Sequence, residues 1–386
     1  MREEASVRLV GLPLSISALL FTALALPAHA ATIVVDVGGS SAYATIQAGI
    51  DASTSGDTVL VMPGTYAGTG NRDIYFNGRE ITLLAEDGPQ QTLIASNRYA
   101  RGFILYQGEG NSAVIDGFTI RDAGLWTSQG NNGGGIYCRN SAPTVRNCVF
   151  DDCFAFGGSQ MMYGAGGGIY CEASDGMLVE DCVFASCRGL GGGGVYASGG
   201  EITLTRCRFE DCSGYYTAGG VSLGPGCLSP ISECTFVGCT SSRSAGALSV
   251  YQSMAVIERC TFVGNIGAQG VVHFGQTSST LQDCIIAFND AAAVRCQTGA
   301  NPEITHCVIF GNAGGDSLCG IHTDNLFVDP AFCDLAGGDL TLCADSPCLP
   351  SNNPWGESIG ALGEGCLGCS SPVEPRSWGR IKALYR

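Results

Sequence analysis

The chain has 386 residues and a net charge of −16, and only 14% of its residues are charged, against about 25% in a typical globular protein. Its hydrophobic content of 45% predicts a packed core and not a disordered chain. The acidic balance argues against nucleic acid or an anionic membrane as the main partner.

Residues 1–30 have the pattern of a secretory signal. Arg2 and Arg8 flank the start, an apolar stretch follows at 9–26, and the residues around His29 are small enough for cleavage after Ala30. The alternative is an uncleaved membrane anchor. No later segment has the ~20 apolar residues that a bilayer span needs. We therefore expect an exported protein of bacterial type, secreted or held at the cell surface.

The first predicted element of the mature chain is a short helix at 43–52. Ile46 and Ile50 lie four residues apart, which places both on one helical face. Gly56-Asp57 ends this region, and the strand 58–62 follows. We expect the helix to cover an open end of the fold and so protect its edge.

A short phrase, Cys-x-Phe/Ile-x-x-Cys/Asn, then recurs at intervals of 23 to 34 residues between first cysteines. A repeat in this range predicts stacked copies of one supersecondary unit. In the last three copies the second cysteine becomes asparagine. The seven copies occupy residues 148–153, 182–187, 207–212, 234–239, 260–265, 284–289 and 307–312.

Each repeat also contains a short apolar strand that follows glycines, such as Gly135-Ile-Tyr-Cys138. The unit is too short for a strand-helix-strand motif, which needs ~30 residues or more. It fits one coil of a parallel β-helix, so the predicted fold is all-β. Successive strands would lie ~4.8 Å apart, and cysteine, phenylalanine and asparagine would each stack on their own kind.

The residue before each first cysteine changes sign of charge at every coil from Asp181 to Asp283, which predicts an outward column of alternating charges. The glycine runs at 166–168 and 191–194 are expected to form turns with positive φ. They precede neither a Lys-Ser/Thr pair nor a helix, which argues against a nucleotide site.

Most of the 21 cysteines are expected to be small buried hydrophobes, because parallel side chains in register point the same way. True disulfides are expected mainly from Cys319 onward. Cys366-Leu-Gly-Cys369 lacks a second pair at zinc-site spacing, so we expect disulfide bonding and no metal there. The candidate disulfide cysteines are Cys319, Cys333, Cys343, Cys348, Cys366 and Cys369.

The repeat pattern fails after about Asn325. We expect the β-helix to occupy 31–325 and a Cys-rich closing segment to follow at 326–369. A linker and basic tail complete the chain at 370–386. The last eleven residues carry four basic and no acidic side chains. The tail is either a sorting or anchoring signal or a disordered terminus.

The chain resembles right-handed parallel β-helix proteins of the pectin lyase-like superfamily, of the secreted bacterial type. The resemblance rests on Thr45-Ile-Gln-Ala-Gly-Ile-Asp51, on Gly56 to Tyr66, on the coil repeats and on Asp329-Pro-Ala-Phe332. It covers roughly residues 33–366. It implies a right-handed β-helix (solenoid) with a short N-terminal capping helix and a Cys-rich C-terminal cap. It says little about activity, because the family includes lyases, hydrolases, adhesins and proteins without known activity.

A lyase-like site in this family would need acidic residues that hold calcium and a basic residue that accepts a proton. The best candidates on neighbouring coils are Asp151 and Asp152 with Asp122, Arg121 and Arg146. Turn acids are also expected on any acidic β-helix. We expect no cofactor, with calcium as the alternative.

The preferred hypothesis is an exported, non-catalytic protein that binds carbohydrate or a cell-surface partner. Loop aromatics, which stack on sugars, are the candidate binding residues: Trp126, Tyr215 and Tyr216. One alternative is a polysaccharide lyase or glycoside hydrolase that acts on acidic polysaccharide. The other is a structural surface protein or adhesin.

Overall fold

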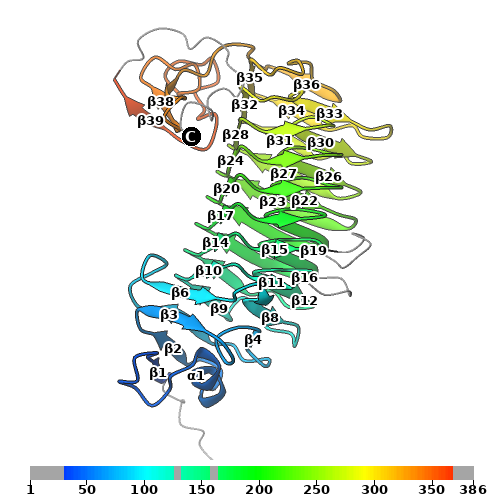
Figure 1. The fold of residues 1–386 in the computed structure, drawn as a ribbon. Helices are drawn as coiled ribbons and strands as arrows, with labels where there is room; N and C mark the ends of the chain where they lie inside the picture. Colours follow the sequence, from blue (N-terminus) through cyan, green and yellow to red (C-terminus); the bar gives the residue numbers. More distant parts are fainter. Residues whose placement is uncertain (1–29, 126–131, 157–163, 368–386) are drawn as a thin grey trace, which may run out of the picture. The chain divides into compact units, whose positions relative to one another are not determined.

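A computed structural model describes residues 30–125, 132–156 and 164–367. The description below concerns the unit that begins at Ala31. Within it the strands of successive coils stack from β1 to β36 (Figure 1). In the described chain one short helix, α1 (Ile46–Ala52), lies between β1 and β2. The all-β solenoid predicted from the repeats is confirmed.

The described coils build two large parallel sheets, and the larger one contains two strands from most coils. Its nineteen strands are β1 (Thr32–Val35), β2 (Thr58–Val61), β4 (Ile74–Tyr75), β5 (Thr82–Ala85), β8 (Phe103–Leu105), β9 (Val114–Asp116), β12 (Ile136–Arg139), β13 (Thr144–Arg146), β16 (Ile169–Glu180), β19 (Val195–Thr205), β22 (Val221–Leu223), β23 (Cys227–Ser232), β26 (Leu248–Tyr251), β27 (Met254–Glu258), β30 (Val272–Gly275), β31 (Thr280–Gln282), β33 (Val294–Cys296), β34 (Glu303–Thr305) and β36 (Ile321–Thr323).

The second sheet consists of the strands that carry the cysteine phrase and their N-terminal equivalents. Its ten strands are β3 (Gly64–Ala67), β6 (Thr92–Ala95), β10 (Thr119–Arg121), β14 (Val149–Asp151), β17 (Val183–Ala185), β20 (Arg208–Glu210), β24 (Thr235–Val237), β28 (Thr261–Val263), β32 (Ile285–Ala287) and β35 (Val308–Phe310).

Three small sheets complete the strand set. The five-stranded sheet contains β15 (Phe154–Ala155), β18 (Arg188–Gly189), β21 (Ser213–Gly214), β25 (Thr240–Ser241) and β29 (Ile266–Gly267). The others are the pair β7 (Tyr99–Ala100) and β11 (Gly124–Leu125), and the C-terminal β37 (Phe332–Asp334), β38 (Asp339–Cys343) and β39 (Glu364–Cys366).

The bend before each first cysteine is a single residue in the left-handed region. Asp181, for example, has φ +53° and Arg206 has φ +52°. This conformation turns the chain between two strands and breaks the alternation of period two. The side chains at this position form ion pairs between coils, with Arg206 Nε 2.7 Å from Asp181 Oδ1 and Arg259 Nη2 3.2 Å from Glu233 Oε1.

The core is a set of side-chain ladders that run through the coils. The rings of Phe150, Phe184, Phe209, Phe236 and Phe262 stack with centroids 4.7–4.8 Å apart, and all are fully buried. The coil spacing of about 4.8 Å sets this distance. Aromatic stacking adds to the large apolar burial of each ring.

The two cysteine columns are buried thiols without disulfides. They also form hydrogen bonds, which the sequence analysis did not anticipate. In the second column Cys187 Sγ donates to the Phe150 carbonyl at 3.3 Å, and in the first column the amide of Cys207 donates to Cys234 Sγ at 3.4 Å. Asn265 makes the same two kinds of contact through its amide, to the Phe236 carbonyl and from the amide of Cys239. In the second column asparagine therefore replaces cysteine and keeps the contact with the carbonyl.

The glycine runs serve mainly to make room, and the expected positive φ occurs at one glycine of each run. Gly166 and Gly192 have positive φ, but the glycines after them do not. A Cβ on Gly193 would lie 2.4 Å from the Gly219 carbonyl oxygen, and one on Gly168 would lie 2.5 Å from the Phe184 ring. Only glycine lets neighbouring coils approach this closely.

The helix α1 packs against the first coil, as predicted. Thr45 caps it by accepting the amide of Ala48 at 3.3 Å, and Ile46 and Ile50 are buried in the core cluster that includes Val35. A Cβ on Gly49 would lie 2.3 Å from Val35 Cγ2, so the helix approaches β1 directly. Within the described residues, no helix is long and apolar enough to cross a membrane.

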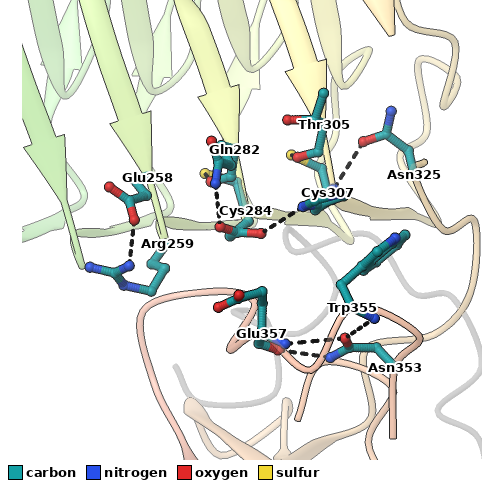
Figure 2. Close-up of polar contacts among 12 residues, drawn as sticks. Glu258, Arg259, Gln282, Cys284, Thr305, Cys307, Asn325, Asn353, Trp355 and Glu357 are labelled. Carbon is teal, nitrogen blue, oxygen red and sulfur yellow. Dashed lines mark hydrogen bonds and ion pairs between the residues drawn. The ribbon is translucent and has the colours of Figure 1, made fainter. Parts of the chain in front are cut away.

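The Cys-rich segment after Asn325 packs against the side of the last coils (Figure 1). Val263 on β28 and the outward positions of β32 and β35 are apolar, unlike Arg208 and Glu210 on β20. They form a cluster with side chains of the segment such as Phe332 and Leu342. Trp355 stacks on His306 at 4.6 Å, and Figure 2 shows Trp355 and Glu357 facing the coil strands. The segment thus caps the coils from the side.

Candidate functional site

A column of outward side chains on the nineteen-stranded sheet contains an abrupt change in size. The rings of Tyr137, Tyr170 and Tyr196 stack at 5.5–5.6 Å. On the next two coils the paired positions are Ser222 and Ser249, and His273 and Arg295 follow. Two small residues between large ones leave a recess that crosses two coils.

This recess is the floor of a cavity of about 250 Å³. Tyr196 forms one end and His273 the other, while Tyr216, Tyr251 and Arg243 contribute to its sides. A second cavity of about 400 Å³ shares Gln269 and His273 with the first and includes Arg295. We call the two together the tyrosine groove.

The tyrosine groove contains cations but no carboxylate among its lining residues. The guanidinium of Arg243 lies 5.1 and 5.3 Å from the ring centroids of Tyr215 and Tyr216. Within the described part of the chain, neither Arg243 nor Arg295 forms an ion pair. In a protein of net charge −16, this concentrates unpaired positive charge at one recess.

His273 connects the two cavities and is only 8% exposed. Its Nδ1 is buried and has no hydrogen-bond partner among the described residues. Burial lowers the pKa of His273, so the neutral imidazole is favoured. A buried polar atom without a partner is costly, and a bound ligand would supply the missing hydrogen bond.

The predicted acidic candidates meet at a different place. Ile120 and Phe150 are paired across β10 and β14. Asp122 and Asp152 follow these strands, and Arg98 forms ion pairs with both, with Nε 3.2 Å from Asp122 Oδ1. Arg188 also contacts Asp152. Both carboxylates are therefore already paired with guanidinium groups.

Burial raises the pKa of Asp152, Arg188 and Arg98 lower it, and Asp122 raises it again. Arg121 and Asp151 form a separate pair at 2.7 Å on the outer face. Arg146 pairs instead with Asp116 at 2.8 Å on the nineteen-stranded sheet. The structure brings Asp122 and Asp152 together, but Arg146 belongs to another contact.

The candidate binding aromatics fall into three situations. Tyr216 lines the tyrosine groove, Tyr215 supports it through Arg243, whose Nη2 donates to the Tyr215 hydroxyl at 3.3 Å, and Trp126 lies outside the described residues. Sequence reasoning missed Ser222, Ser249 and His273. The signal was present, because each is the second residue of its strand, in the same place as Tyr170 and Tyr196.

The candidate disulfide cysteines also divide. Cys319 pairs with Cys296, and Cys333 pairs with Cys366. Cys343 also takes part in a disulfide, and its Sγ lies 3.6 Å from that of Cys366. The expectation for Cys348 was wrong: it is a free thiol, buried in the apolar cluster under the C-terminal segment. Cys369 and the basic tail lie outside the described residues.

Among the described residues, the sulfur atoms of Cys333, Cys343 and Cys366 form the one group of His, Cys, Asp or Glu ligands that is compact enough for a metal. Because Cys333 and Cys366 are joined as a disulfide, they cannot act as thiolate ligands.

A family model described as a right-handed β-helix region matches residues 90–255 and 159–329, which together span more than half of the chain. No curated protein matches this chain.

Three solved structures show weak similarity. A pectin methylesterase from carrot has 12% identity and a TM-score of 0.28, covering 64% of this chain and 82% of its own. A mannuronan C-5 epimerase A-module from Azotobacter vinelandii has 16% identity and a TM-score of 0.29, covering 70% and 73%. The ORF18 protein of Geobacillus virus E2 has 13% identity and a TM-score of 0.33, covering 70% and 59%. The family match establishes that this chain belongs to the proteins with a right-handed β-helix region.

Proposed function

We propose that this protein binds an acidic polysaccharide in the tyrosine groove and does not convert it chemically. The observation that carries the proposal is the pair of unpaired arginines, Arg243 and Arg295, in a groove without carboxylates on a strongly acidic protein. Charge-assisted hydrogen bonds to a carboxylate or sulfate are roughly twice as strong as neutral ones.

The rest of the groove suits a sugar chain. Tyr216 and Tyr251 are 45% and 37% exposed and offer ring faces for stacking. Ser222 and Ser249 leave space on the floor, and the unpartnered Nδ1 of His273 is available to a ligand hydroxyl. Export, which the N-terminal pattern predicts, would bring the groove into contact with cell-surface or environmental polysaccharide.

The test is isothermal titration calorimetry with pectate, alginate and neutral dextran. We expect the two acidic chains to bind and dextran to bind much more weakly, with affinity that falls as salt rises. Replacing Arg243 and Arg295 by Gln should weaken binding by about tenfold or more, since a hydrogen bond to a charged group contributes ~1.5–3 kcal/mol.

The matched control is Arg139→Gln. Arg139 is an exposed arginine of the same sheet that pairs with Glu172 outside the groove, and its loss should leave binding unchanged. Equal binding of dextran and pectate, or an equal effect of all three arginine replacements, would contradict the proposal.

A second candidate function, a lyase or hydrolase, is favoured by the contact of Asp122 with Asp152 and by the raised pKa of Asp152. Its test is the release of unsaturated or reducing-end product from pectate and alginate, with and without calcium. We expect none. Product formation that Asp152→Ala abolishes would overturn the non-catalytic proposal.

A further inference from the structure

A third cavity lies at the corner between the two strands that each coil contributes to the large sheet. The corner residue adopts a left-handed conformation, with Gln252 at φ +49° and Gln276 at φ +52°. The equivalent corners on either side are Gly226 and Gly299. Two long side chains between two glycines leave open space beside them, and the cavity there measures about 620 Å³.

The lining of this corner cavity is uncharged and has an apolar patch. Leu228 and Met254 are paired across adjacent coils, yet they remain 55% and 60% exposed. Beside them, Gln252 Nε2 donates to Gln276 Oε1 at 2.6 Å. Among the described contacts, Gln276 Nε2 and Gln252 Oε1 have no partner, so one donor and one acceptor remain available.

The corner cavity adjoins the tyrosine groove along the chain. Pro225 and Tyr251 line the groove, and the residues that follow them, Gly226 and Gln252, line the cavity. A ligand that occupies the groove can therefore extend a substituent around the corner. The groove offers cations, whereas the cavity offers an apolar surface and a free amide donor and acceptor.

We propose that the corner cavity binds the acetamido group of an N-acetylated amino sugar within the acidic polysaccharide. The methyl group would contact Leu228 and Met254, the carbonyl would accept from Gln276 Nε2, and the N–H would donate to Gln252 Oε1. This inference rests on the proposed function, and it narrows the ligand to chains that contain both acidic and N-acetylated sugars.

The test compares two forms of a hyaluronan oligosaccharide, one with its natural N-acetyl groups and one with N-formyl groups. The N-formyl form keeps the amide and the charge but lacks the methyl. Wild-type protein should bind the acetyl form about fourfold more tightly, the value expected for burying one CH₂-sized group. Met254→Ser should abolish this preference.

Val256→Ser is the matched control. Val256 lies on the same strand as Met254 and is similarly exposed at 52%, but it does not line the cavity. This variant should keep the fourfold preference, and both variants should unfold at the wild-type temperature because both positions face outward. Gln276→Leu should weaken binding of both ligand forms.

The outcomes separate the two proposals. If pectate binds but the acetyl and formyl oligosaccharides bind equally, the acetamido inference is overturned and the groove proposal stands. The same holds if Val256→Ser removes the preference as fully as Met254→Ser does. If neither pectate nor hyaluronan binds, the proposed function fails and this inference fails with it.

Discussion

Asn265 and Asn289 occupy the same position on adjacent coils, and Asn289 Oδ1 accepts both the side-chain Nδ2 of Asn265 at 3.0 Å and its backbone amide at 2.8 Å. Asn289 Nδ2 in turn donates to Asn312 Oδ1 at 2.7 Å. Each asparagine therefore satisfies the backbone of the coil before it, in a core where unpaired polar groups are costly.

Asn289→Ala should lower the free energy of unfolding by about 2–4 kcal/mol, because it leaves buried partners on both neighbouring coils unsatisfied. Asn289→Cys should cost clearly less, because cysteine fills this position four coils in succession, at Cys153 to Cys239, with analogous contacts. Urea denaturation of both variants measures the difference. Equal losses would contradict the interchange of thiol and amide.

Ser222→Tyr should extend the tyrosine stack by one ring and fill the groove floor. We expect at least tenfold weaker binding of acidic polysaccharide, because the new ring would occupy the groove beside Tyr196. A loss of about 1–3 kcal/mol in the free energy of unfolding should accompany it, since the buried Ser222 hydroxyl accepts the Ala218 amide at 2.9 Å. Thr280→Tyr, an outward position on β31, is the control and should not affect binding. Calorimetric titration and thermal unfolding report the two effects, and unchanged affinity in Ser222→Tyr would exclude the groove as the site.

Asp181 and Asp283 occupy the same column but should have opposite effects on stability as pH changes. The side chain of Asp283 is only 4% exposed, and burial raises its pKa, with Glu357 and Glu258 adding to the rise while Gln282 and His306 lower it. Arg206 lowers the pKa of Asp181. Figure 2 shows Gln282, Glu258 and Glu357 where the coil strands meet the C-terminal segment.

The folded protein binds the Asp283 proton more tightly than the unfolded chain does. Its contribution to stability therefore falls as pH rises from about 3.9, the unfolded value, through the raised folded pKa. Asp283→Asn should remove this decline. For Asp181 the stabilisation is present above about pH 3.9 and is lost as pH falls through the lowered folded pKa, so Asp181→Asn should cost stability only at the higher pH values.

Thermal unfolding temperatures of the two aspartate variants, measured at intervals from pH 3 to pH 7, check these signs. The difference between each variant and the wild type is the quantity to compare. If both differences in unfolding temperature have the same sign above pH 5, the proposed opposite pKa shifts of Asp181 and Asp283 do not determine how these residues affect stability.

The Cys296–Cys319 disulfide joins residues 23 apart at the last coil. Replacing both cysteines by alanine should lower the free energy of unfolding by about 3 kcal/mol, the value expected for a loop of this length. The control is Cys348→Ala, which removes a buried thiol that forms no bridge. When both proteins are measured under reducing conditions, which also open the Cys333–Cys366 disulfide in each, the wild type and the double variant should be equally stable; a persistent difference would indicate lost packing.

The coil architecture was predictable because its signal repeats. Cysteine and phenylalanine recur at each coil, and stacking places equivalent residues in register, so Phe150 and Phe184 could be paired before the structure was known. The helix at Ile46 was predictable because its two isoleucines define a face. The position of the Cys-rich segment was not predictable. Apolar residues that contact this distant segment, such as Ile285, look in the sequence like any other apolar strand residue.

The groove was missed for a different reason. The recess exists because the column of tyrosine rings is interrupted by small side chains. Ser222 indicates a recess only once it is known to be paired with Tyr196 on the preceding coil. The catalytic candidates were chosen by residue type, and type alone does not show that Arg98 and Arg188 already neutralise Asp152. Both the position of the groove and the pairing of Asp152 depend on contacts between coils, which the sequence alone does not give.

The buried thiols can report which coils of this protein separate first during unfolding. Fifteen free cysteines are sealed in the described core, and eleven of them mark successive coils from Cys148 to Cys307. A thiol reagent can reach each one only when its coil separates from its neighbours. The order in which these cysteines react would thus map, coil by coil, where the solenoid begins to come apart.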